Sequence, residues 1–366
     1  MRVLCLSNMY PGPSDPDYGA FVATMCDAMS RAGAEIDLAT IDVRGGGALR
    51  TPAKYGGLTR RALPLAHKAD VVYAHFLFPT GAVARLCRAA GGAPFVVTAH
   101  GRDVRNLEHA VVRRGTATAL SGAAGVIAVS RYLAGRLRET GLRLPPMHVV
   151  NMGVDLRRFL PGDRQAARAR LRLSAHGPLV LAAGGLTERK NPLTLLQAFA
   201  RLRSARPEAR LALVGDGPLA GAVDAGVERL GLGGAVVRTG AIPHDQVSDW
   251  MAASDALALV SRVEPLGIVA LEALASGRPV VATRVGGAAE VVPAGSAGAI
   301  VDPADPLDIA AGLEAVLATP PSPAACRRAA EAHGVDRQAR RVLAVLAGAA
   351  ARGAGHDALA GTLETR

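Results

Sequence analysis

The stretch that decides the fold is SRVEPLGIVALEALASGRPVV, residues Ser261–Val281. It reads as a strand end, a loop, a helix, a glycine that stops the helix and a further strand, which is an α/β unit. Pro265 and Gly267 open the helix, so free backbone N–H groups and the positive end of the dipole favour an anion there. Glu264 precedes the helix and Glu272 lies within it. An acid near a helix start is stabilising in any case, which explains Glu264 better than the apolar-flanked Glu272.

The same alternation of short apolar runs and helical patterns extends in both directions and indicates parallel sheets. We predict α/β architecture with two Rossmann-like domains that face each other across a cleft. The domains span residues 1–155 and 178–335, joined by a polar, arginine-rich linker, 156–177, and followed by a C-terminal helix that crosses back and a frayed tail, 336–366. The predicted strands are Val3–Ser7, Glu35–Ile41, Val71–Ala74, Phe95–Ala99, Gly125–Val129, His148–Val149, Leu179–Ala183, Leu211–Val214, Ala235–Thr239, Ala256–Val260, Pro279–Ala282 and Ala299–Val301.

The length and the charge of the chain restrict the kinds of domain organisation, binding partner and cellular location that we expect. At about 150 residues per domain, 366 residues fit two domains. The formal net charge is +11, but the arginines are scattered and aromatic residues make up 3%, so no basic tract with stacking platforms is present and no nucleic-acid partner is expected. Peripheral contact with an anionic membrane fits better. Four dispersed cysteines and the lack of a run as long as a membrane span predict a cytoplasmic protein, at most attached to the inner face of the membrane.

Several common catalytic motifs are missing. The first strand is followed by Asn8–Pro13 rather than G-x-G-x-x-G, and the chain has no P-loop, no G-x-S-x-G and no H-E-x-x-H. Asp15 and Asp17 lie in a proline-rich loop, where turn chemistry explains both. No metal site and no cofactor are therefore predicted.

Two glutamates with seven residues between them, in E-P-x-G…E-A-x-x-x-G-x-P-V, resemble the signature of retaining family 4 glycosyltransferases of the GT-B fold. The resemblance extends from Met1 to about Ala347. The early segment Asn8–Phe21, with Tyr73–Phe76, looks closest to members that build cell-surface polysaccharides such as teichuronic acid. The other matching pieces are Thr98–Asp103, Asn151–Asp155 with Phe159, Gly184–Asn191, Leu211–Pro218 and Ala282–Glu290.

The resemblance implies that the N-terminal domain binds an acceptor, whether a glycan, a lipid-linked or a small molecule, and that the C-terminal domain binds a nucleotide-sugar donor as substrate. It places Glu272 on the ribose, Glu264 on the sugar, and Arg189 and Lys190 on the phosphates. The catalytic residues it implies are His100, Glu264 and Lys190. Further expected donor contacts are Gly19, Gly215, Leu266, Gly267 and Ile268.

The residues themselves support part of this assignment. Arg189 and Lys190 precede a helix opened by Pro192, whose dipole adds to their charge. Lys190 is one of only three lysines in an arginine-dominated chain, which suggests that arginine would not serve there. Asp103 either orients His100, binds the acceptor or caps a helix. His75 and His244 are expected to be structural or surface residues.

Two departures from the family pattern leave alternatives open. Gly185 stands where the family usually has arginine, although Arg189 can supply the charge. Met152 separates Asn151 from Gly153 in the piece that resembles the family's N-G-V-D…F crossover, where asparagine is usually followed directly by glycine. The expected reaction is metal-independent transfer to the same face of the sugar, in which the leaving phosphate takes the acceptor proton. The alternatives are a nucleotide-sugar epimerase of the same fold, which needs acid/base carboxylates in the N-terminal domain, and a non-catalytic sugar-nucleotide-binding protein.

Overall fold

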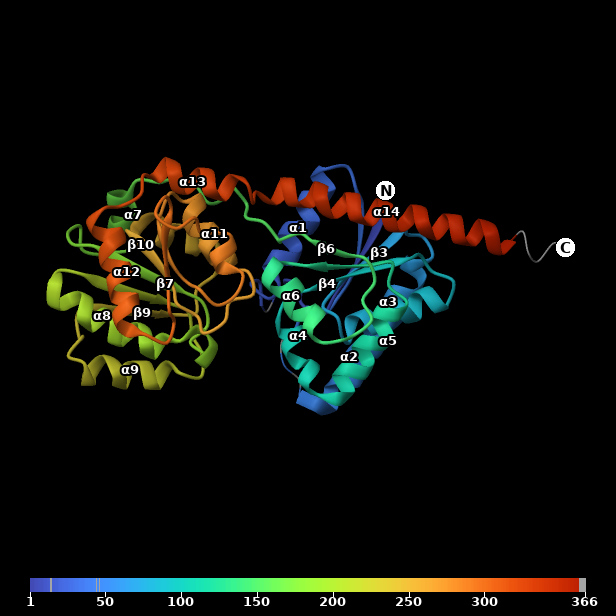
Figure 1. Ribbon diagram of the computed structural model, residues 1–366, viewed down its shortest axis with the longest axis horizontal. Helices are drawn as coiled ribbons and strands as arrows, with labels where there is room; N and C mark the ends of the chain where they lie inside the picture. Colours follow the sequence, from blue (N-terminus) through green and yellow to red (C-terminus); the bar gives the residue numbers. More distant parts are fainter. Residues whose placement is uncertain (14, 44, 46, 362–366) are drawn as a thin grey trace. The chain divides into compact units, whose positions relative to one another are not determined.

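The computed structural model describes residues 1–361 apart from 14, 44 and 46, with backbone alone for 47–51 and 354–361. The chain divides into two compact units, each built around one parallel sheet (Figure 1). Unit 1 comprises Met1–Met152 and Val335–Arg366, and unit 2 comprises Gly153–Gly334. No helix in the described part of the chain is both long and apolar enough to cross a membrane.

Unit 1 holds a six-stranded parallel sheet in the order β2-β1-β3-β4-β5-β6. Its central strands β3, β4 and β5 are buried throughout, because helices cover both faces of a parallel sheet. The strands are β1 Arg2–Ser7, β2 Glu35–Thr40, β3 Val71–His75, β4 Phe95–Ala99, β5 Gly125–Ala128 and β6 Met147–Val149. The helices are α1 Ala20–Arg31, α2 Gly47–Ala66, α3 Thr80–Ala89, α4 Arg102–Arg105, η1 Asn106–Glu108, α5 Ala110–Ser121, α6 Arg131–Glu139 and α14 Val335–Gly361.

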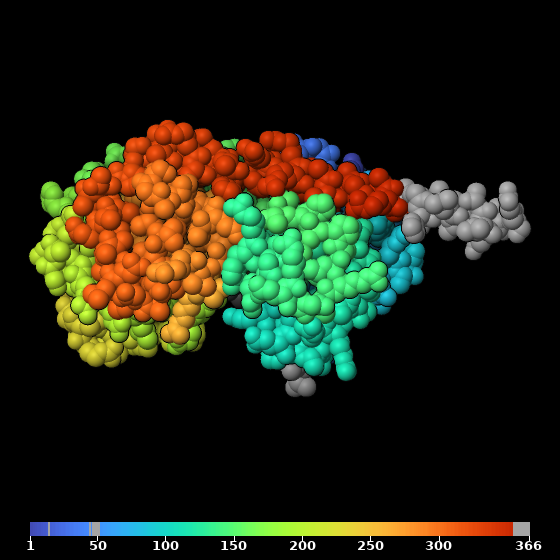
Figure 2. All heavy atoms as spheres, in the orientation of Figure 1, coloured from blue at the N-terminus to red at the C-terminus, as the bar shows by residue number. Residues whose placement is uncertain are grey.

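The last helix, α14, belongs to unit 1 although it follows unit 2 in the sequence. It packs against α1, β3 and β4, and Figure 2 shows it (red) lying on the surface of the N-terminal segments. Arg31 of α1 pairs with Asp336 of α14. The frayed tail expected from about Gly353 is helical to Gly361, and residues 362–366 lie outside the described part of the chain.

Unit 2 repeats the architecture with the strand order β12-β11-β10-β7-β8-β9. Leu195 and Phe199 of α8 pack with Leu211 and Leu213 of β8 in its core. The strands are β7 Leu179–Ala183, β8 Arg210–Val214, β9 Val236–Gly240, β10 Ala256–Leu259, β11 Val280–Thr283 and β12 Gly298–Val301. The helices are α7 Arg164–Arg170, η2 Glu188–Lys190, α8 Pro192–Ala205, α9 Ala220–Arg229, η3 His244–Gln246, α10 Val247–Ala253, α11 Ile268–Ala275, η4 Ala288–Glu290, α12 Pro306–Ala318 and α13 Pro323–Glu331.

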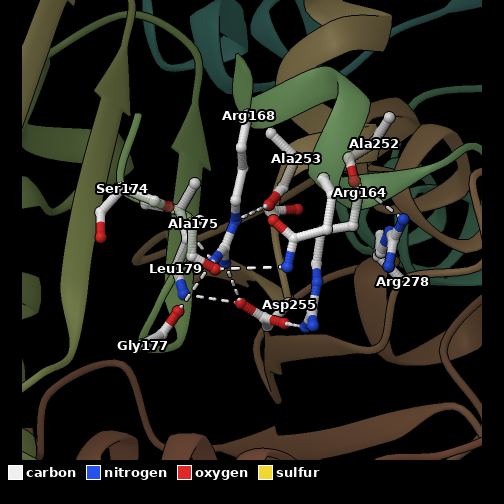
Figure 3. Close-up of polar contacts among 12 residues, drawn as sticks. Arg164, Arg168, Ser174, Ala175, Gly177, Leu179, Ala252, Ala253, Asp255 and Arg278 are labelled. Carbon is white, nitrogen blue, oxygen red and sulfur yellow. Dashed lines mark hydrogen bonds and ion pairs between the residues drawn. The ribbon is translucent and has the colours of Figure 1, made fainter. Parts of the chain in front are cut away.

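All twelve predicted strands are confirmed, each with ends within one residue of the expected ones. The predicted linker, 156–177, differs from its expected role, because it lies inside unit 2 and forms α7. Arg168 of α7 is 2% exposed and donates to Oδ2 of Asp255 at 2.6 Å (Figure 3). It also donates to the carbonyl oxygens of Ala253 and Gly177. An arginine-rich segment that looks solvated in the sequence therefore holds unit 2 together.

Candidate functional site

Glu264 occupies the loop between β10 and α11 and is buried. Its Oε2 accepts hydrogen bonds from Nζ of Lys190 at 2.7 Å, from Oγ of Ser261 at 3.0 Å and from Nη1 of Arg189 at 3.3 Å. Burial would raise the pKa of Glu264, but Lys190 and Arg189 outweigh it and hold the pKa below its ordinary value. The side chain is therefore an ionised carboxylate held in place by two cations.

The main chain of Glu264 is clamped by the loop that follows β11. The N–H of Glu264 donates to the carbonyl oxygen of Val285 at 3.1 Å, and the N–H of Gly287 donates to the carbonyl oxygen of Glu264 at 2.7 Å. Gly286 has φ +116°, and a Cβ there would lie 2.1 Å from the same oxygen of Glu264. Only glycine allows this close approach, which explains Gly286 in the Ala282–Glu290 motif.

The two cations are positioned by Asn191, a residue whose role sequence reasoning missed. Asn191 is 4% exposed, and its Nδ2 donates to the carbonyl oxygens of Val260 at 3.2 Å and Pro303 at 2.6 Å. The N–H of Arg262 also donates to the carbonyl oxygen of Arg189 at 2.8 Å. These bonds fix the loop that carries Arg189 and Lys190 to the end of β10.

Two glycine turns follow β7 and β8. A Cβ on Gly215 would lie 2.2 Å from the carbonyl oxygen of Gly184, so Gly215 is required for the two turns to touch. A Cβ on Gly184 would meet Cε of Lys190 at 3.4 Å, so this turn also leaves space for the lysine. Gly185 differs from both, because a Cβ there would make ordinary contacts and its φ lies outside the left-handed region.

Helix α11 begins beside the Glu264 cluster without a side-chain cap. Its N-cap, Gly267, is left-handed at φ +86°, so the first N–H groups of the helix are available to a ligand or water. Leu266 is buried under this turn and Ile268 is half-buried at the first helical position. A cationic pair, a carboxylate and an uncapped helix start are thus brought together at the carboxyl ends of β7 and β10.

Glu272 lies one turn further along α11 and takes a different partner. It is 6% exposed, and its Oε1 lies 3.0 Å from Nε2 of His244. The sequence predicted that a charge among apolar neighbours needs a partner, and the partner is a histidine expected to be structural or at the surface. A lone histidine after Pro243 gives no local signal of this contact, because the pair is separated by 28 residues.

In unit 1, Asp103 organises the turn after β4. Its Oδ1 accepts from the N–H groups of Gly101 at 2.8 Å, Val104 at 3.0 Å and His100 at 3.1 Å, and its Oδ2 accepts from the N–H of Leu77 at 3.1 Å. Burial raises the pKa of Asp103, and these backbone bonds oppose the rise. The geometry favours the alternative in which Asp103 orients His100. It does not favour acceptor binding, because the buried carboxylate already accepts four N–H groups.

His100 stands at the end of β4 and is partly exposed. Its ring lies against Phe21 and Phe76, at centroid distances of 5.1 Å and 4.5 Å. Its Nε2 is 3.1 Å from Nδ1 of His75, a second contact that sequence reasoning missed. Burial lowers the pKa of His100 to about 3, so the ring is neutral at neutral pH.

Gly19 precedes α1 and has φ +76°. A Cβ there would lie 2.4 Å from the carbonyl oxygen of Met9, so the turn requires glycine whether or not a ligand binds. Gly19 also begins the helix that carries Phe21 to His100. The predicted site residues thus form two groups: in unit 2 a carboxylate with two cations beside the start of α11, and in unit 1 a group centred on His100.

Comparison with known proteins identifies two family models along the chain. The model described as "Glycosyltransferase Family 4" matches residues 19–158, and the one described as "Glycosyl transferases group 1" matches residues 163–333. A D-inositol 3-phosphate glycosyltransferase of Catenulispora acidiphila is 33% identical over 329 residues, which cover 83% of this chain and 78% of that protein. A GDP-mannose-dependent phosphatidylinositol monomannoside mannosyltransferase of Mycolicibacterium smegmatis is 33% identical over 69% of each chain.

The fold has solved counterparts. HepE from Anabaena, crystallised with UDP, superposes with a TM-score of 0.77 at 23% identity, over 95% of this chain and all of that one. The finer likeness to teichuronic-acid members is not supported, because the relatives found are named for inositol phosphate and phosphatidylinositol mannoside. The short early segments that suggested it carry less information than a match over 83% of the chain. The chain belongs to the glycosyltransferases of group 1 and family 4, enzymes with the GT-B fold.

Proposed function

We propose that the protein is a retaining glycosyltransferase that moves a sugar from a nucleotide-sugar donor to a phosphorylated polyol, without a metal ion. The observation that carries the proposal is the buried Glu264 carboxylate, held by Lys190 and Arg189 next to the uncapped start of α11. Carboxylate oxygens suit sugar hydroxyls, whereas cations and free N–H groups suit a diphosphate. One cluster thus offers both kinds of partner that a nucleotide sugar needs.

The proposed chemistry uses fixed charges. The bond between the anomeric carbon and the phosphate oxygen breaks, and a bond to the acceptor oxygen forms on the same face of the sugar. The leaving diphosphate takes the acceptor proton. Negative charge grows on the leaving phosphate, so Lys190, Arg189 and the N–H groups of α11 stabilise the transition state more than the ground state. Glu272 is proposed to accept hydrogen bonds from the ribose.

The charge of unit 1 supports an anionic acceptor. Unit 1 has 23 lysines and arginines against 13 acidic residues, a formal net charge of +10, whereas unit 2 has 19 against 18, or +1. A phosphorylated polyol is the acceptor class that this excess favours. The name of the Catenulispora relative, an inositol 3-phosphate glycosyltransferase, points to the same class.

The same excess supports peripheral contact with an anionic membrane. Four exposed arginines lie on α4 and α5, which are separated by the short η1: Arg102, Arg105, Arg113 and Arg114. Val111, 76% exposed, lies among them. Cations around an exposed apolar residue suit the surface of an anionic bilayer. We call Arg102, Arg105, Val111, Arg113 and Arg114 the cationic patch.

The epimerase alternative is weaker. It needs an acid/base carboxylate in unit 1, and Asp103, the candidate beside His100, is buried against four backbone N–H groups. The non-catalytic alternative was suggested by Gly185, and Arg189 reaches Glu264 without an arginine at that position. Neither alternative has an observation of its own in its favour.

Calorimetry with a free nucleoside diphosphate tests the assignment of the two glutamates. Glu272→Gln should weaken binding by about ten- to a hundredfold, since a hydrogen bond to a charged group is worth about 1.5–3 kcal/mol. Glu264→Gln should leave diphosphate binding nearly intact and mainly lower kcat, because the sugar is absent from this ligand. Equal weakening by both variants would contradict the division of roles.

Transfer itself is tested with a panel of UDP-, GDP-, ADP- and dTDP-sugars and with D-inositol 3-phosphate against unphosphorylated inositol. We expect transfer to the phosphorylated acceptor, retention of the anomeric configuration by proton NMR, and full activity in EDTA. Activity lost on chelation and restored by magnesium or manganese would overturn the electrostatic account. Epimerised donor without acceptor, or binding without transfer to any acceptor, would support the alternatives instead.

A further inference from the structure

His75 is a buried histidine that the proposed chemistry does not use. It ends β3, is 0% exposed, and places its Nδ1 3.1 Å from Nε2 of His100. Its other ring nitrogen, Nε2, is buried and has no hydrogen-bond partner in the part of the chain that the structure describes. Tyr73 packs against the His75 ring at a centroid distance of 4.4 Å. A buried imidazole with one shared and one unpartnered nitrogen has a restricted choice of tautomer.

Both rings are neutral. Burial lowers the pKa of each histidine, and the neighbouring His100 lowers that of His75 further. A neutral imidazole has one N–H donor and one lone pair. Across the 3.1 Å contact one ring must therefore donate and the other accept. The question is which of the two carries the shared hydrogen.

The unpartnered Nε2 of His75 decides between the two arrangements. If His75 accepted the bond at Nδ1, its only hydrogen would be on Nε2, as a buried N–H with no acceptor. If His75 donates from Nδ1, Nε2 keeps only an unpartnered lone pair. Buried N–H groups without an acceptor are rarer than under-used acceptors, because the lost hydrogen bond is not regained elsewhere. The arrangement in which His75 donates is favoured, and His100 then accepts at Nε2.

We propose that His75 is a positioning residue that fixes His100 as the Nδ1–H tautomer, so that His100 presents a hydrogen-bond donor to a substrate oxygen. The Nδ1 of the partly exposed His100 makes no hydrogen bond to a described residue, so it is the nitrogen left for a ligand. A donor at this position cannot take a proton from the acceptor hydroxyl. The role of His100 in substrate recognition rests on the proposed function, in which the leaving phosphate takes that proton. The tautomer of His100 does not depend on the proposed function.

The surrounding turn holds the pair in register. Phe76, next to His75, has φ +73°, an uncommon conformation for a residue with a large side chain. Its N–H donates to the carbonyl oxygen of Thr98 at 2.8 Å, and its ring packs on His100. Such outliers persist where the surroundings over-determine them and are enriched at functional sites. The two histidines stand at adjacent strand ends, since β3 pairs with β4.

Nitrogen-15 NMR of histidine-labelled protein tests the tautomer without any substrate. His100→Gln assigns the His100 ring by the loss of its signals. We expect the hydrogen of His100 on Nδ1 and that of His75 on Nδ1 in the wild-type protein. A hydrogen on Nε2 of His100, or an exchange-averaged mixture of tautomers, would overturn the proposal even if the protein transfers sugar as proposed.

Variants of His75 test its positioning role. In His75→Asn the amide nitrogen lies near the former Nδ1 and can still donate to His100, so kcat/KM should stay within about threefold. His75→Leu removes the donor, should release the tautomer of His100 and should lower kcat/KM roughly tenfold. The exposed His67 of unit 1 gives the matched control, His67→Leu, with no change expected.

The outcomes separate the inference from the proposed function. If His75→Leu fails to fold, the wild-type spectrum and His75→Asn still decide the tautomer. If the wild-type protein transfers no sugar, the proposed function fails while the spectrum continues to test the tautomer. Wild-type activity in His75→Leu, with its His100 tautomer released, would overturn the positioning role alone.

Discussion

The two units share one architecture and an arginine-rich composition but use arginine differently. In unit 2 several arginines form hydrogen bonds and ion pairs within the unit. Arg168 binds Asp255 and several carbonyl oxygens. Arg206 binds both carboxylate oxygens of Glu314, and Arg327 donates to three carbonyl oxygens. In unit 1 many arginines are exposed, as in the cationic patch. The net charge of +11 is thus almost wholly a property of unit 1. The net charge of each unit, counted separately, is therefore more informative about binding partners than the net charge of the whole chain.

The largest expected effect breaks an internal arginine of unit 2. Arg168→Met leaves Asp255 with only the exposed Arg164 as a cationic partner and removes the donor to the carbonyl oxygens of Ala253 and Gly177. Breaking a buried pair from one side costs about 3–5 kcal/mol, and the remaining partner places the expected loss at the lower end. The free energy of unfolding in urea measures the loss. The matched change in unit 1, Arg138→Met, removes an exposed arginine and should cost less than about 0.5 kcal/mol. Similar losses in both variants would remove the distinction between the units.

The second prediction tests whether the exposed arginines of unit 1 bind an anionic membrane. Arg105→Ala with Arg114→Ala should weaken binding to vesicles that contain phosphatidylglycerol by about 2 kcal/mol, roughly thirtyfold, at about 1 kcal/mol per cation. Co-sedimentation at 0.1 M salt measures the change. Arg201→Ala with Arg229→Ala removes the same charge from exposed positions of unit 2 and should leave binding unchanged. Equal weakening by the two pairs would mean that total charge, not the cationic patch, determines binding.

The third prediction separates the two groups of site residues by pH. The pKa of His100 is about 3 in the folded protein against about 6.5 unfolded, so its stabilising contribution is complete above pH 6.5 and falls as the pH drops toward 3. The folded pKa of Glu264 is also lowered, but that contribution is lost only below its unfolded value, about 4.3. Between pH 7.5 and 5.5 wild-type protein should lose about 1 kcal/mol more stability than His100→Gln. Thermal unfolding across this range checks it, with Glu264→Gln expected to follow the wild type until about pH 4.5.

The smallest expected effect concerns Gly185, where unit 2 has room for a cation. Because Gly185 has an ordinary φ and a Cβ there would make only ordinary van der Waals contacts, Gly185→Arg should fold and tighten nucleoside diphosphate binding by about three- to tenfold, or roughly 1 kcal/mol. Gly185→Gln is the uncharged control and should leave calorimetric affinity unchanged. A gain with glutamine as large as that with arginine would point to contact rather than charge.

The sequence by itself determined the alternation of strands and helices, the turn before α11 and the candidate cations. Hydrophobic periodicity and turn chemistry depend on neighbouring residues alone. The twelve strands and the helix start at Pro265–Gly267 can therefore be predicted without knowledge of the fold. The rarity of lysine drew attention to Lys190, and a charge among apolar residues predicted a partner for Glu272. These inferences needed no contact between distant parts of the chain.

Only the tertiary structure decided which charges meet. Lys190 and Glu264 are 74 residues apart, and His244 meets Glu272 across 28. His75 and His100 meet because the carboxyl ends of adjacent parallel strands converge on one edge of the sheet. The segment 156–177 has the composition of a linker, yet Arg168 within it is buried, because guanidinium burial depends on carbonyl and carboxylate acceptors brought from elsewhere in the fold. Local patterns fix where chain elements form, whereas the partner of a buried polar group is fixed by non-local packing.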